Sequence, residues 1–68
     1  MKYQVIRLIT SAKVDPDVIK QNCRQTSRGW EAIIDREVVD INQAMRTCSA
    51  YQRVHGHPYR HYLVEEVP

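Results

Sequence analysis

The sequence predicts one α+β domain, with a single three-stranded sheet and one main helix and one shorter helix on one face of it. The chain has 68 residues, which leaves no room for a second domain and makes residues 1–68 one unit. Hydrophobic residues make up 43% of it, close to the average of globular domains, and Trp30 and four tyrosines argue against disorder. Strand-like and capped helical segments alternate along the chain, which predicts the order β-α-β-α-β.

The first predicted strand covers residues 2–10. This segment is rich in β-branched and aromatic residues and contains neither glycine nor proline. Its apolar pairs, Val5-Ile6 and Leu8-Ile9, occupy both faces of a strand. We therefore expect it to lie in the centre of the sheet.

A short helix is predicted next. Asp15 is suited to the N-cap, where its carboxylate would accept backbone hydrogen bonds, and Pro16 is suited to the first helical position. Only Ile19 and Cys23 form an apolar stripe, so we expect the helix to end before residues 26–29. If it does not form, the order reduces to β-β-α-β.

Two more strands are predicted, over residues 30–34 with a possible extension to Val38, and over residues 59–67. The main helix lies between them. Asp40 and Gln43 have the spacing of a capping box, and Val39 with Ala44 that of a hydrophobic staple. Gly56 is placed to end the helix in the left-handed conformation.

One face of this main helix is expected to seal the sheet, and its apolar members are Ile41, Ala44, Met45, Cys48 and Tyr51. An aspartate in place of Ala44 or Met45 would bring an unpaired charge into the core. We therefore expect either substitution to unfold the domain.

Charge and hydropathy limit the classes of function. The net charge is +2, too small to indicate nucleic-acid binding by itself, although seven of the ten basic residues are arginine, which is enriched in protein interfaces. No signal peptide and no apolar stretch long enough to cross a membrane is recognisable, which predicts a cytoplasmic protein. In that compartment Cys23 and Cys48 would be free thiols.

We expect neither a metal, nor a cofactor, nor catalysis. The possible ligands are Cys23, Cys48, His55, His57 and His61, and they lack the closely spaced pairs of structural zinc sites. The chain contains no Gly-x-Ser-x-Gly elbow and no phosphate-binding glycine loop. A binding protein is therefore the expected class.

Two kinds of partner fit a binding protein of this composition. For a protein partner, the candidate residues are Arg46, Arg53, Arg60, Tyr59, Glu31, Asp35 and Glu37. For nucleic acid bound directly, they are Lys20, Arg24 and Arg28, which are four positions apart and would share one side of the first helix if that helix extends so far. An exposed strand edge would also allow a homodimer.

The stretch from residues 29–31 through the capped "Gln-Ala" helix at 40–45 to Gly-His-Pro-Tyr-Arg at 56–60 resembles small proteins of bacteriophages and prophages. Among these are anti-CRISPR proteins with a three-stranded sheet and one main helix, and a phage inhibitor of bacterial RNA polymerase. The chain also resembles HicB-type antitoxins. The likeness implies an inhibitor that blocks a host nucleoprotein complex by surface binding; the alternative is a small nucleic-acid-binding regulator or antitoxin-like module.

Overall fold

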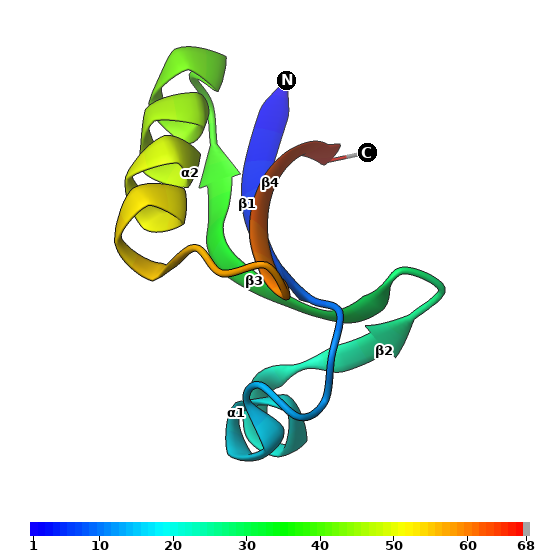
Figure 1. Cartoon of the computed structure of the whole chain (residues 1–68). Helices are drawn as coiled ribbons and strands as arrows, with labels where there is room; N and C mark the ends of the chain where they lie inside the picture. Colours follow the sequence, from blue (N-terminus) through cyan, green and yellow to red (C-terminus); the bar gives the residue numbers. More distant parts are fainter. Residues whose placement is uncertain (68) are drawn as a thin grey trace.

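The computed structural model describes residues 1–67 and arranges them as a four-stranded antiparallel sheet with two helices (Figure 1). The elements are β1 (Lys2–Ile9), α1 (Pro16–Asn22), β2 (Arg24–Thr26), β3 (Gly29–Val38), α2 (Ile41–His55) and β4 (Arg60–Val67). The strand order is β2-β3-β1-β4. Two β-α-β units are thus interleaved, which is the element order of the split β-α-β motif.

The α+β class is confirmed, but the prediction of a three-stranded sheet is wrong, and so are both predicted element orders. The additional strand is β2, where the sequence indicated only a fading helix. With three residues, β2 is too short to show an alternating pattern. Gly29 makes its hairpin possible, because it has φ +145° and a Cβ there would lie 2.5 Å from the carbonyl oxygen of Ile9.

β1 is the central strand, as predicted, and pairs with β3 on one side and β4 on the other. Alternation along β1 sends Val5 and Arg7 to the face that carries α2, and Gln4, Ile6 and Leu8 to the opposite face. We call this opposite face, which α2 does not cover, the open face of the sheet.

The core lies between α2 and one end of the sheet. Ala44 is fully buried against Val5 and Val38, and Cys48 and Val64 pack around this cluster. The Asp40 carboxylate accepts a hydrogen bond from the backbone N–H of Asn42 at 2.9 Å, so Asp40 is the N-cap of this helix. The described residues show no return hydrogen bond from Gln43, so the predicted capping box is not complete.

Three details predicted for this helix are wrong. Val39 is 73% exposed and forms no staple, and Gly56 is extended, with φ −62°. Of the five apolar residues predicted to seal the sheet, Ala44 alone is buried, while Met45 is 54% exposed. The helix is therefore anchored by a narrower stripe than its sequence pattern indicates.

Side chains of α2 also close part of the outer edge of β4. The amide oxygen of Gln52 accepts a hydrogen bond from the backbone N–H of Tyr62 at 3.0 Å, and the Cys48 thiol donates to the carbonyl oxygen of Tyr62 at 3.1 Å. The backbone groups of Arg60 bond those of His57 in both directions. An added strand would find these edge groups occupied, which is a common protection against edge pairing.

α1 is attached loosely. It has seven residues, none of them buried, and its expected N-cap residue makes no capping hydrogen bond. The Asp15 carboxylate instead accepts hydrogen bonds from the guanidinium of Arg60 in β4. This ion pair ties the start of α1 to the sheet.

Substitution of the two neighbouring helix positions should therefore give opposite results. Ala44→Asp brings a charge against Val5 and Val38 and should lower the free energy of unfolding by about 3 kcal/mol or more. Met45→Asp points into solvent and should leave the protein folded, contrary to the expectation from sequence. Urea unfolding followed by circular dichroism measures both. Equal destabilisation of the two variants would contradict this orientation of α2.

Candidate binding groove

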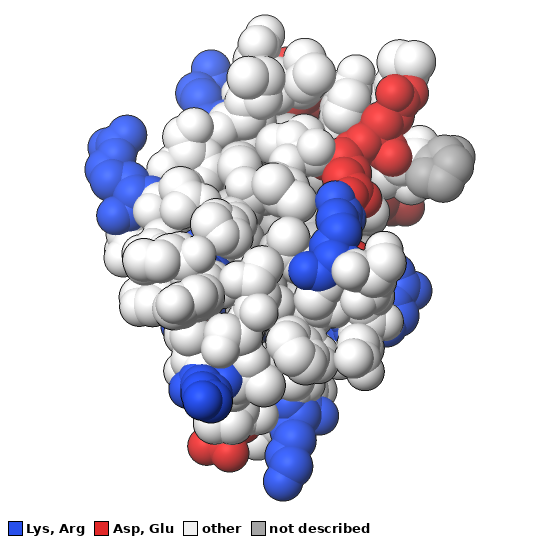
Figure 2. Space-filling view, turned by 45° about the vertical axis from the view of Figure 1, so that its right-hand side comes forward, with Lys and Arg blue, Asp and Glu red and all other residues white. Residues whose placement is uncertain are grey.

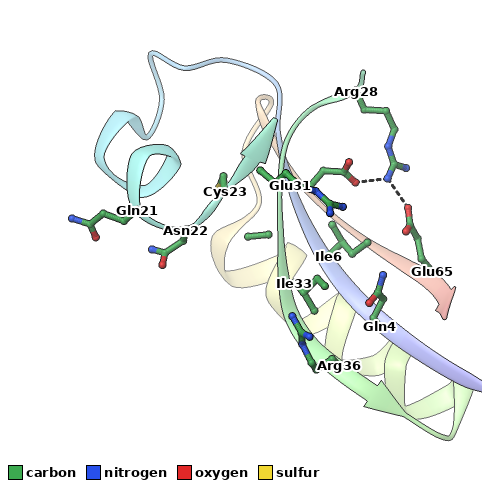
Figure 3. Close-up of a pocket in the computed structure, with 12 residues that line it drawn as sticks. Gln4, Ile6, Gln21, Asn22, Cys23, Arg28, Glu31, Ile33, Arg36 and Glu65 are labelled. Carbon is green, nitrogen blue, oxygen red and sulfur yellow. Dashed lines mark hydrogen bonds and ion pairs between the residues drawn. The ribbon is translucent and has the colours of Figure 1, made fainter. Parts of the chain in front are cut away.

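A groove of about 670 Å³ lies on the open face and opens to solvent (Figure 3). Its floor includes Ile6 of β1 and Ile33 of β3, which are paired in register. Ile6 is only 4% exposed but Ile33 is 40% exposed. Its polar lining consists of Gln4, Gln21, Asn22, Cys23, Arg24, Arg28, Glu31, Arg36 and Glu65.

Arg28, in the turn between β2 and β3, bridges two strands across the open face. Its Nη2 donates to Glu31 of β3 and, at 2.5 Å, to Glu65 of β4, as the dashed lines in Figure 3 show. β1 lies between those two strands, so the three side chains together extend across β3, β1 and β4. We call this arrangement the Arg28 bridge.

The Arg28 bridge shifts the ionisation of its members. The hydrogen bond with Glu65 is the main cause that raises the pKa of Arg28. A hydrogen bond from Thr26 and, after the opposing effect of burial, the bond from Arg28 lower the pKa of Glu31. The Glu31 side chain is 12% exposed, so its charge is held within the wall of the groove.

Arg24 and Arg36 differ from Arg28, because neither makes an ion pair with any described residue. Both line the groove. Arg24 is the register partner of Glu31, and its charge helps to lower the pKa of that carboxyl, but it makes no ion pair with it. Both arginines can therefore contact an incoming group. The groove thus combines an apolar floor, two available cations and amide side chains.

Three of the residues predicted to contact nucleic acid do not form a helical stripe, and that prediction is wrong. Lys20 lies on α1, Arg24 lies in β2 and Arg28 lies in the following turn. The structure brings Arg24 and Arg28 together in the groove for a different reason, the path of the β2–β3 hairpin.

The basic residues predicted to contact a partner are divided between two places. Arg46 and Arg53 are exposed on the outer side of α2, beside a shallow hollow that Met45 also lines. Arg60 is committed to Asp15 and also donates to the carbonyl oxygen of His55 at 3.3 Å. Tyr59 is 51% exposed in the loop before β4.

The three predicted acidic contacts do not form one acidic edge. Glu31 belongs to the Arg28 bridge, whereas Glu37 lies near the other end of β3 with φ 61° and pairs with Lys2 at 3.7 Å. Asp35 is half-buried opposite Val5, where a bulge interrupts the pairing of β1 with β3. β3 therefore carries these carboxylates in separate surroundings.

Sequence reasoning missed Gln4, Arg36 and Glu65 as neighbours of this groove. Register supplies the signal, because Gln4 pairs with Glu65 across β1 and β4 and so shares its face. That pairing depends on which strands are adjacent, which the sequence pattern does not specify.

Charge is dispersed over the surface. Figure 2 shows Lys and Arg side chains mostly around the rim of the face in view, with uncharged residues between them. Over residues 1–67, no three His, Cys, Asp or Glu side chains gather as a possible metal site. None of the helices in that range is both long and apolar enough to cross a membrane.

The Arg28 bridge should make stability depend on pH. Because the pKa of Glu31 is lower in the folded than in the unfolded chain, its contribution is present above the unfolded value of about 4.3 and is lost as pH falls through the folded value. Glu31→Gln should therefore lower the free energy of unfolding at neutral pH. The difference in this free energy between the variant and the parent should become smaller as pH falls through that window. Urea titrations across this range measure the effect, with Glu66→Gln, outside the bridge, as control. Parallel pH profiles for Glu31→Gln and the parent would contradict the assignment.

Comparisons of the chain with protein-family models, with curated proteins and with solved structures found no match.

Proposed function

We propose that this chain is a non-enzymatic binding protein that docks a segment of a partner protein in the groove on its open face. The observation that carries the proposal is the composition of the groove: the partly exposed Ile33 on its floor beside two arginines, Arg24 and Arg36, that form no ion pair with the described residues. An apolar centre with an arginine-containing polar rim is typical of protein interfaces. The unpaired guanidinium groups favour a segment that carries acidic side chains.

The aromatic residues favour protein over nucleic acid at this groove. Single-stranded nucleic acids are usually held by exposed aromatic rings on which bases stack. Here Trp30 and Tyr62 pair in register with Ile9 and Arg7, and so belong to the face that carries the helices.

In its narrower form, the proposal is an inhibitor encoded by a phage or mobile element that blocks a host nucleoprotein complex, of the anti-CRISPR type. The support is the small size, the arginine-rich composition and the resemblance described from the sequence. In this form, Arg24 and Arg36 bind acidic side chains of a protein component of that complex.

A nucleic-acid-binding regulator is the second candidate, and it rests on α2. Arg46 and Arg53 line a hollow together with Asn42, Met45 and Ser49, a set without a carboxylate. Two cations suit a phosphate backbone but give only weak, salt-sensitive binding. This surface therefore provides the matched comparison for the groove.

A pair of double variants separates the two surfaces. Arg24→Glu with Arg36→Glu reverses the charge of the groove, and Arg46→Glu with Arg53→Glu makes the same change on α2. Each protein is immobilised and exposed to a bacterial lysate, and bound proteins are identified by mass spectrometry. We expect a partner that binds the parent and the α2 variant but binds the groove variant at least about tenfold more weakly, since hydrogen bonds to charged groups contribute about 1.5–3 kcal/mol.

Binding of plain DNA and RNA at several salt concentrations completes the comparison. Loss of the partner with the α2 variant alone would refute the groove as the docking site. Micromolar nucleic-acid binding that weakens steeply with salt and requires Arg46 and Arg53 would replace the proposal by the regulator. Circular dichroism verifies that both double variants are folded.

A further inference from the structure

Arg7 occupies a position that is unusual for a cation. It lies on the central strand β1, on the face that carries α2, between the fully buried Val5 and Ile9 on that face. Its register partners are Ala32 and Tyr62. The side chain is half-buried, and the part of it nearest the strand lies beside core side chains, where polar groups are normally paired.

No carboxylate among residues 1–67 pairs with Arg7. Its Nε is buried and makes no hydrogen bond, and its Nη2 lies 4.0 Å from the Cys23 sulfur, a weak acceptor. A buried donor without an acceptor is costly, and more so when it belongs to a charged group. Arg7 thus has capacity for an acceptor that the described part of the chain does not supply.

A small pocket adjoins Arg7, with Asp15 and Val18 from the α1 side and Tyr51 and His55 from α2. Its volume is about 210 Å³, room for roughly seven waters at ~30 Å³ each. Asp15 supplies its one carboxylate and is already bound to Arg60. Arg7 therefore contributes a positive charge that nothing else in the lining neutralises.

We propose that this pocket between α1 and α2 binds a small oxyanion, a carboxylate or a phosphate group, on the guanidinium of Arg7. The planar guanidinium presents N–H donors side by side, which matches two oxygens of such a group. The Tyr51 and His55 side chains border the same space and add polar groups. The volume restricts the ligand to a few heavy atoms beyond the anionic group.

The site is independent of the proposed docking groove. The groove lies on the open face, whereas this pocket lies on the face that carries the helices. Failure of either proposal leaves the other intact.

Titration of the ¹⁵N-labelled protein by NMR tests the proposal directly. The probes are inorganic phosphate and sodium acetate, each compared with sodium chloride at equal ionic strength. We expect a saturable shift of the Arg7 Nε–H resonance and of the backbone amides of Val18, Tyr51 and Tyr62. Response to phosphate, to acetate or to both supports the site and identifies the group it prefers. The Arg7 resonance is assigned by its disappearance in Arg7→Lys.

The variants provide the second measurement. Arg7→Lys keeps the charge but removes the paired donors. It should raise the dissociation constant of the bound anion by about tenfold or more. Lys2→Arg, at the start of β1 and outside both proposed sites, should bind as the parent does. Three results would overturn the proposal: a shift with chloride equal to that with both probes, no saturable shift of the Arg7 resonance, or shifts confined to surface arginines such as Arg46. The titration of the parent protein alone is sufficient to show any of them.

Discussion

A single substantial helix on a four-stranded sheet is the constraint on which the rest of this structure depends. α2 covers the region around Val5 and Val38, and no other helix of the described chain buries a residue. A domain of this length buries only about 60% of its unfolded surface, and its core contributes at most about 3–5 kcal/mol. The open face and the α1 end must therefore be organised by side chains that are not part of the core.

Two arginines supply that organisation. Arg28 connects the β2–β3 turn to Glu65, 37 positions away, and Arg60 connects β4 to Asp15, 45 positions away. The Arg28 side chain is 46% exposed, and ion pairs of such exposure contribute little to stability. Their role is to position other elements. Arg28 fixes the β2–β3 hairpin beside the open face and forms part of the wall of the groove. Arg60 fixes α1 beside the sheet and forms part of the wall of the Arg7 pocket.

Local signals predicted the elements well and their assembly poorly. The Asp40 cap, the central position of β1 and the strand before Val38 followed from residue types and spacing. The strand β2 did not, because three residues show no periodicity and its hairpin depends on the turn at Gly29. The exposure of Met45 did not either, because an apolar stripe indicates that a helix packs but not how far it lies over the sheet. For the groove, the sequence pattern indicates Arg24 and Arg28, but through a helical spacing that the structure does not contain. Glu65 lies near them because β4 is adjacent to β1, which the pattern does not specify.

Arg7 shows how a local inconsistency can indicate a site. Alternation along β1 places this cation in a row with Val5 and Ile9, where an apolar side chain would extend the core towards α1. On the face that carries α2, apolar side chains surround Ala44, whereas Arg7 and Asp15 line a pocket near α1, a helix with no buried residue. Natural sequences are consistent at most positions and depart from this at functional or strained sites. A guanidinium whose Nε is buried without a hydrogen bond, on an inner strand of a domain with little stability to lose, is such a departure, and a bound anion would give it a physical reason.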